Sequence, residues 1–248
     1  MLNSDYNCCK IKSKEWNNWR SNYEIYYSGY QFLMIGCTNI RNNTPSSPRE
    51  SIKTYYENGK MESKIIYEGN KRNGKMTSYY ENGKIAVKGF FKDDKRDKKW
   101  IFYNEKNGKI SSIEKYKDGQ LNGEQVYYHD NGKIKVKGNY TNGKRSGFWE
   151  MFDEEGQLEV QNIFIDGENI ISIAIYQKNG KLLCNGNVVN QLRQGEWKYF
   201  DEDGNIAYIV NYERGIRNGE WHAFDRDGNI LMNGIYRNGR IVGIDIEE

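Results

Sequence analysis

The sequence predicts an all-β protein built around an elongated, single antiparallel sheet of about eight tandem β-hairpin repeats of 24 residues. Three observations predict this class. Glycines recur at a fixed interval, aromatic residues keep constant places relative to those glycines, and apolar residues alternate with polar ones between them. In such an open solenoid, each hairpin is stabilised mainly by its neighbours.

The glycines define the repeat. Residues 195–206 read GEWKYFDEDGNI and residues 219–230 read GEWHAFDRDGNI, so nearly the same stretch occurs twice at a separation of 24. The series runs through Gly59, Gly83, Gly108, Gly132, Gly156, Gly180, Gly204 and Gly228, with intervals of 24 apart from one of 25. A second series, which includes Gly147 and Gly219, is expected to mark the link to the next hairpin. We expect the repeats to occupy residues 52–248.

Alternation along each unit predicts strands. After Gly132 the apolar side of the chain reads Ile134, Val136, Gly138 and Tyr140, with lysines and an asparagine between them. This period of two residues is that of an extended strand with one apolar face, and it does not fit a helix. The NG and DG pairs between the strands of a repeat are typical of tight hairpin turns.

Aromatic residues occupy three places in the unit. Tryptophans precede the first glycine, usually by seven residues, and Trp197 and Trp221 are expected to pack against neighbouring strands. A tyrosine or phenylalanine lies about four residues before that glycine, and this series is expected to line a binding face: Tyr79, Tyr103, Tyr128, Phe152, Tyr176, Phe200 and Phe224.

The N-terminal residues differ from the repeats. We expect residues 1–44 to form a capping segment that protects the edge of the sheet, and residues 45–51, with Pro45 and Pro48, to form a linker. For residues 14–36 two interpretations stay open. The spacing of Trp16, Trp19 and Tyr23 fits one face of a helix, whereas YEIYYSGYQFLMIG also reads as two short strands.

Units such as YYHDNGKIKVKGNYTNGKRSG and WKYFDEDGNIAYIVNYERGIRNGE resemble the MORN variant repeat of the second type, found in bacterial YwqK-like proteins that are labelled antitoxins. The resemblance covers about four fifths of the chain. It departs at Asp93, Asp94 and Asp97, where glycines are usual, and repeats five and six each lose one glycine. It implies a scaffolding or binding module without a catalytic motif, with a toxin as partner or, as in some eukaryotic members, a lipid.

Catalytic and metal-binding patterns are weak. His129 and His222 lie beside the repeat aromatics with no distinctive nucleophile next to them, which favours structural histidines and a protein that is not an enzyme. Cys8, Cys9, Cys37 and Cys184 lack zinc-site spacing, and Cys184 is expected to be buried as a small apolar residue. We expect neither a metal nor another cofactor.

The DEDGN and DRDGN segments beginning at Asp201 and Asp225 resemble part of a calcium loop, but they lack its later glutamate and flanking helices. The favoured alternative is a hairpin turn whose aspartate bonds its own backbone. A net charge of +3, from 37 basic and 34 acidic residues, argues against a specific nucleic-acid partner. The mixed charges of residues 92–99 predict a solvated loop, with contact to phosphate or anionic lipid as the alternative.

Three function classes remain. The first is a non-catalytic protein-binding module, in particular an antitoxin or immunity protein, that uses an aromatic-rich face. The second is a surface- or membrane-associated protein for adhesion or lipid binding. An enzyme is the third, and it requires a closed pocket that joins His129 or His222 to a carboxylate. A cytoplasmic location is expected, with lipidation of Cys37 after FLMIG as the alternative. The identity of the partner, the binding face and the oligomeric state stay open.

Overall fold

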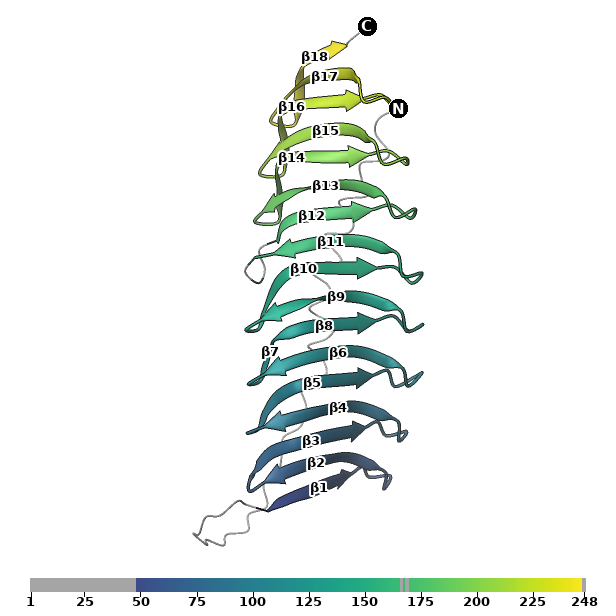
Figure 1. The fold of residues 1–248 in the computed structure, drawn as a ribbon, viewed down its shortest axis with the longest axis vertical. Helices are drawn as coiled ribbons and strands as arrows, with labels where there is room; N and C mark the ends of the chain where they lie inside the picture. The colour runs from purple at the N-terminus through teal and green to yellow at the C-terminus, as the bar shows by residue number, and fades with distance from the viewer. Residues whose placement is uncertain (1–47, 166, 168–169, 247–248) are drawn as a thin grey trace. The chain divides into compact units, whose positions relative to one another are not determined.

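The computed structural model describes residues 48–165, 167 and 170–246. The expected N-terminal cap, including residues 14–36, lies outside these ranges. The described residues form strands and turns, and one open antiparallel sheet contains all 18 strands, which follow one another in sequence order (Figure 1). The predicted fold class is therefore confirmed.

Each strand pairs with its neighbours in the sequence. β7 and β8 occupy one position in the sheet, as a single strand that is interrupted at Asn122. The strands are β1 (Arg49–Tyr55), β2 (Met61–Glu68), β3 (Lys71–Tyr79), β4 (Ile85–Lys92), β5 (Lys95–Tyr103), β6 (Ile110–Lys117), β7 (Gln120–Leu121), β8 (Gly123–Tyr128), β9 (Ile134–Thr141), β10 (Lys144–Phe152), β11 (Leu158–Phe164), β12 (Ile170–Tyr176), β13 (Leu182–Val189), β14 (Leu192–Phe200), β15 (Ile206–Glu213), β16 (Ile216–Phe224), β17 (Ile230–Arg237) and β18 (Arg240–Ile246). The first of them begins within the segment expected to be a linker.

Both kinds of turn depend on residues that tolerate a positive φ. At the first glycine series, Gly132 has a φ of 93° and its N–H donates to the carbonyl oxygen of His129 at 2.8 Å. At the other end of the hairpin, Asn142 and Gly143 have φ values of 50° and 79°. The second glycine series does not form these links, which corrects our expectation. Gly147, for example, has a φ of 64° inside β10, where the pairing with β9 shifts register.

The charged segment at residues 92–99 is also not a loop. Asp93 and Asp94, with φ values of 48° and 65°, form a tight turn, and β4 and β5 continue on either side of it. The Oδ1 atom of Asp94 accepts hydrogen bonds from the backbone N–H of Arg72 at 2.9 Å and from its Nε at 3.1 Å. Aspartates therefore replace the usual glycines here because short polar side chains tolerate this backbone conformation.

The core lies on one side of the sheet. We call this side, which carries Trp100, Trp149, Trp197 and Trp221, the tryptophan face, and the other side the opposite face. Trp100 is 1% exposed and Trp197 2% exposed. Residues paired across strands share a face, so the pairing of Trp197 with Gly186 and Val210 places these residues on the same side. The core is therefore built by consecutive repeats along one face of a single sheet.

Candidate binding surfaces

The seven aromatic residues predicted to bind a partner form one row. Each is the last residue of its strand and pairs with the first residue of the following strand, as Phe152 does with Leu158 and Phe200 with Ile206. Because Phe152 follows Trp149 by three residues on one strand, it points to the opposite face. All seven side chains are half-buried: Tyr79, Tyr103, Tyr128, Phe152, Tyr176, Phe200 and Phe224. The structure thus brings them together beside the turns, and their role in binding stays a prediction.

Tryptophan packing depends on glycine in the neighbouring strand. Trp100 lies over Gly89, Trp149 over Gly138 and Trp197 over Gly186, so closely that a Cβ atom at any of these glycines would overlap the indole. The indole N–H then donates to the carbonyl oxygen of the residue after the glycine. These oxygens belong to Phe90, Asn139 and Asn187, at 3.2, 3.1 and 3.0 Å. The expectation that Trp197 packs against a neighbouring strand is confirmed, as it is for Trp221, which approaches Gly234.

Arginines, which sequence reasoning missed, lie over these rings. The guanidinium carbon lies 4.6 Å from the ring centre of Trp100 for Arg96, 5.1 Å from that of Trp149 for Arg145 and 4.6 Å from that of Trp197 for Arg193. A planar guanidinium can stack on an aromatic face while its N–H donors, which point outward in its own plane, stay free to form hydrogen bonds. The signal in the sequence is an arginine four residues before each tryptophan.

Tyrosine hydroxyls accept hydrogen bonds from the same arginines. Nη1 of Arg193 donates to the hydroxyl oxygens of Tyr199 and Tyr212 at 3.0 and 2.9 Å. Burial raises the pKa of Tyr212, but the hydrogen bond with Tyr199 and the charge of Arg193 outweigh it, so its net pKa is lowered. Burial raises the pKa of Tyr116, and the neighbouring Glu114 raises it further. These shifts follow from a packed structural network of arginine, tyrosine and tryptophan side chains on the tryptophan face.

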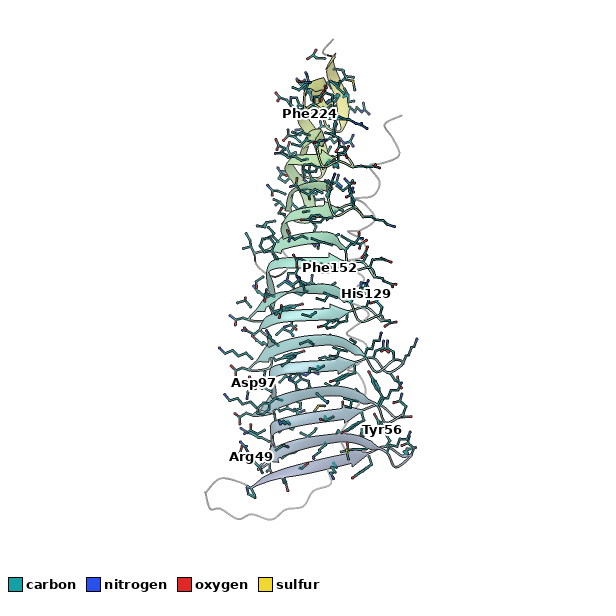
Figure 2. All side chains as sticks on the ribbon, turned by 45° about the vertical axis from the view of Figure 1, so that its right-hand side comes forward. Arg49, Tyr56, Asp97, His129, Phe152 and Phe224 are labelled. Atoms are coloured by element: carbon teal, nitrogen blue, oxygen red, sulfur yellow. The ribbon has the colours of Figure 1, made fainter. Side chains whose placement is uncertain are left out.

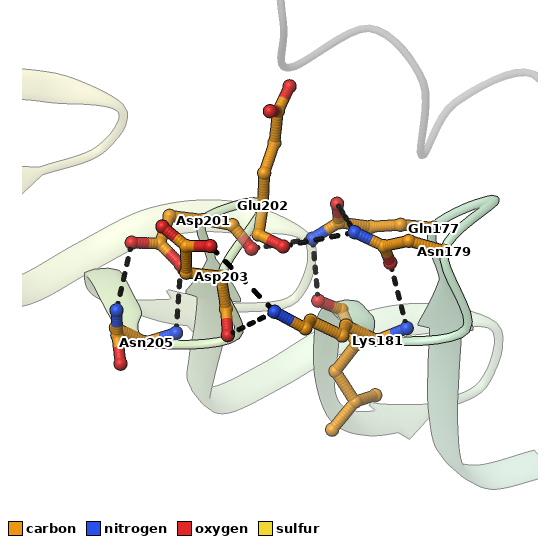
Figure 3. Close-up of polar contacts among 8 residues, drawn as sticks. Gln177, Asn179, Lys181, Asp201, Glu202, Asp203 and Asn205 are labelled. Carbon is orange, nitrogen blue, oxygen red and sulfur yellow. Dashed lines mark hydrogen bonds and ion pairs between the residues drawn. The ribbon is translucent and has the colours of Figure 1, made fainter.

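The turns of successive repeats are joined by side chains. Nδ2 of Asn179 donates to the carbonyl oxygen of Glu202 at 3.0 Å, and Nζ of Lys181 donates to that of Asp203 at 2.7 Å (Figure 3). Nε2 of Gln177 donates to the carbonyl oxygen of Asp201 at 2.7 Å. The same pattern recurs at other NGK turns, where Asn131 and Lys133 reach Glu154 and Glu155. The asparagine and lysine of the NGK motif therefore connect repeats in addition to shaping a turn.

In the DEDGN and DRDGN turns, the first aspartate accepts hydrogen bonds from the backbone of the same turn. Oδ1 of Asp201 accepts the N–H of Asn205 at 2.8 Å, and Oδ1 of Asp225 accepts the N–H groups of Asp227 and Asn229 at 2.9 and 2.8 Å. The expected hydrogen bonds between each aspartate and the backbone of its own turn are present. Within residues 48–165, 167 and 170–246, no three His, Cys, Asp or Glu side chains gather closely enough to hold a metal ion.

The two histidines and Cys184 pack against the residues that form the sheet and its turns. Nε2 of His129, a residue labelled in Figure 2, lies 2.9 Å from the carbonyl oxygen of Phe152 in the next repeat. Gln177 holds the same position in a later repeat and donates to the carbonyl oxygen of Asp201. The ring of His222 lies 6.2 Å from that of Phe224. Cys184 is fully buried, as expected. The described residues contain no helix with the length and apolar character needed to span a bilayer.

The opposite face has two parts with different chemistry. Along β13 to β17 it exposes aliphatic side chains, with Val189 55%, Leu192 47%, Ile216 52% and Ile235 41% exposed. Val189 and Leu192 pair directly across the turn, and Leu192 lies beside Gly215, the residue before Ile216. Along β1 to β6, each strand instead places an exposed lysine on this face. Sequence reasoning missed this division because it depends on strand register.

The chain matches the MORN repeat variant in four segments, residues 52–68, 72–93, 121–142 and 193–214. The sheet is a MORN-like open solenoid. The four matched segments share the glycine and aromatic positions described above, and the unmatched repeats between them continue the same sheet. Among curated proteins, none matches the chain.

The solved structures similar to this chain include three at 10–11% identity. A GtfA/B complex bound to UDP and GlcNAc has a TM-score of 0.15, with 48% of this chain and 21% of that chain covered. A TcdB2-TccC3-Cdc42 structure has a TM-score of 0.23, with 77% and 12% covered, and a porin-like protein from Bacteroides uniformis has a TM-score of 0.20, with 82% and 99% covered. The chain thus spans 21% and 12% of the first two chains' lengths.

Proposed function

We propose that the protein is a non-catalytic binding module that docks another protein on the opposite face of its sheet. The exposed aliphatic side chains of Val189, Leu192, Ile216 and Ile235 support this proposal most directly. Val189 and Leu192 pair directly, and Leu192 lies against Gly215 beside Ile216. Adjoining apolar side chains of this kind are typical of protein interaction sites. The tryptophan face exposes apolar side chains as well, Ile52 on the first strand and Ile241 and Ile244 on the last, but between these strands its aromatic and arginine side chains pack on one another. The opposite face is the side on which exposed aliphatic groups lie within the repeats.

The aromatic row extends this surface. Phe200 and Phe224 lie on the same face beside the turns, where half-buried rings offer rigid area for contact at little entropic cost. An antitoxin or immunity protein, which sequesters a toxin by surface contact, is the specific form of this function that the resemblance of the repeats supports. Association with a membrane or cell surface is the alternative outcome of the experiment that tests the proposal.

The test is affinity capture of the tagged full-length protein from its own cells, with soluble and membrane fractions analysed separately by mass spectrometry. A stoichiometric soluble protein partner is expected. Replacing Val189, Leu192 and Ile216 together by serine should abolish its recovery while the melting temperature stays unchanged. Trp197→Ala should lower the melting temperature instead, because this indole is buried in the core.

A partner that is recovered equally well with the serine variant would overturn the assignment of this face. Recovery of the protein with membranes, modified at Cys37 and without a protein partner, would overturn the protein-binding function. Phe200→Ala provides a second test of the aromatic row. If the row binds the partner, this variant should capture less partner and should lose less thermal stability than Trp197→Ala.

A further inference from the structure

Six lysines lie on the opposite face of the first six strands, one on each strand. We call them the lysine patch: Lys53, Lys64, Lys75, Lys88, Lys99 and Lys115. All six are exposed. Their shared face follows from the register, in which Lys53 pairs with Lys64, Lys75 with Phe90, and Lys88 with Ile101.

Two cross-strand pairs in the patch join like charges. Lys53 pairs with Lys64, and Lys99 pairs with Lys115. Like charges directly opposite each other destabilise a sheet. Lys115 has an acidic neighbour, Glu124, at 3.6 Å between Nζ and Oε2. Among the described residues, none of the other five lysines forms an ion pair, and Glu68, on the same face of β2, is paired with Arg49 at 3.6 Å. The patch therefore carries a local excess of positive charge.

The same face changes character farther along the sheet. On β14 to β18 it carries both signs of charge, and Lys198 lies 3.3 Å from Glu196. The charged residues there are Lys198, Arg237 and Arg240 together with Glu196, Glu213, Glu220 and Asp245. The net charge of +3 for the whole chain therefore conceals a basic region at one end of this face. A charge that is concentrated in this way attracts and orients an oppositely charged partner.

We propose that the lysine patch docks an acidic surface of a protein partner. This proposal rests on the protein-binding function above and specifies the chemistry of the partner. Apolar residues lie between the lysines, since Ile101 and Ile113 pair across β5 and β6 and are half-buried. A protein surface supplies carboxylates and apolar side chains together, whereas a nucleic-acid backbone supplies charge without apolar groups to match these isoleucines.

The face that carries the patch is large enough for a protein interface. Six strands about 4.8 Å apart, each of about eight residues that rise ~3.3 Å, give this whole face an area of roughly 750 Å², of which the lysines are the charged part. A standard protein interface buries about 800 Å² on each partner. The arginines at the core of these repeats, Arg72 and Arg96, lie on the tryptophan face over aromatic rings. Arg49, on the same face of β1 as the patch, is paired with Glu68 at 3.6 Å. The patch itself therefore offers lysine ammonium groups rather than the planar forks best suited to bidentate phosphate recognition.

The proposal is tested with the full-length protein and three probes: a synthetic peptide in which glutamates flank leucines, a single-stranded oligothymidylate of equal charge, and phosphatidylserine vesicles. We expect saturable binding of the peptide that weakens with added salt. The variant K53E/K64E/K88E should bind it at least about tenfold more weakly. The matched control K178E/R226E/R237E makes the same charge change at exposed positions outside the patch and should bind as the wild type does.

Carbodiimide cross-linking, which joins lysine amines to carboxylates in contact, should locate the peptide at Lys64 and Lys88 and leave Lys198 unmodified. Tighter binding of the oligothymidylate or the vesicles than of the peptide would overturn the choice of a protein partner. Equal loss of binding in both variants would overturn the patch itself. If the captured cellular partner binds K53E/K64E/K88E normally, the protein-binding function stands and this inference fails, so the two failures are distinguishable.

Discussion

Trp149 and Gly138 face each other across β9 and β10, and the indole occupies the space that a side chain on Gly138 would fill. The indole N–H donates to the carbonyl oxygen of Asn139 at 3.1 Å. Where the corresponding residues are Glu114 and Gln125, the amide of Gln125 donates to the carbonyl oxygen of Lys115 at 3.1 Å in the same manner. A large flat ring and a missing side chain, eleven residues apart in the sequence, therefore form one packing unit.

The first prediction concerns that unit. Gly138→Ala should destabilise the protein by about 1–3 kcal/mol, because the added methyl group overlaps an indole that is held by its hydrogen bond. Urea unfolding measures the effect. Gly243→Ala is the matched control, since a Cβ atom there meets no heavy atom within 4 Å, and it should be neutral. Equal losses in the two variants would contradict steric overlap as the cause.

The second prediction concerns Arg193, which lies over Trp197 and donates to two tyrosine hydroxyls. Arg193→Met should cost about 1–3 kcal/mol, because those partly buried hydroxyls lose their charged donor. It should also raise the pKa of Tyr212, since the charge of Arg193 lowers it. Urea unfolding and ultraviolet titration of tyrosinate measure the two effects. The exposed Arg237→Met serves as control, and an unchanged Tyr212 titration would refute the electrostatic coupling.

A third prediction addresses the links between turns. The double variant N179A/K181M should speed amide hydrogen exchange at residues 201–204, because it removes the side chains that bond to the carbonyl groups of that turn. Glu202→Ala is expected to leave exchange unchanged, since its backbone carbonyl, rather than its side chain, accepts the bond from Asn179 (Figure 3). If exchange changes in Glu202→Ala but not in N179A/K181M, the side-chain contacts between the turns do not protect these amides.

The fourth prediction is a dependence on pH. The backbone N–H of Asn205 lowers the pKa of Asp201, and the side chain and backbone of Asn229 lower that of Asp225. A lowered pKa in the folded state means that the stabilisation is present above the ordinary aspartate pKa and is lost as the pH falls through the lowered value. The variant D201N/D225N should therefore lose less stability on acidification than the wild type. Melting temperatures from pH 6 to pH 2 measure this, and parallel curves would contradict it.

Much of the fold was predictable because it is repeated. The alternation around Val136 and the spacing of Gly132 from Gly156 recur in copy after copy, so local signals that are weak in a single hairpin reinforce one another. The link between repeats was predicted wrongly because a glycine with positive φ fits either a turn or a bulge. Gly147 takes the bulge inside β10, and Asn142 with Gly143 forms the turn.

The candidate surface was predictable in part. The row through Phe152 and Phe200 was found from spacing, but its face was not. That face depends on parity along the strand and on a register shift beside the row, where Met151 pairs with Val160 and Phe152 with Leu158. The lysine patch was hidden for the same reason. In the sequence its members are scattered among acidic residues, and only the pairing of strands places Lys53 beside Lys64.

The sequence by itself determined the hairpin repeat, its strands and its glycine-containing turns, because these follow from backbone preferences and from a period of two residues within short segments. The tertiary structure decided which side of the sheet is buried, how arginines cover the tryptophans, and where the lysines gather. These features depend on register between strands, because a shift of one residue moves every side chain to the other face. The surface available to a partner therefore depends on how strands of neighbouring repeats pair. That pairing cannot be read from the sequence of one repeat.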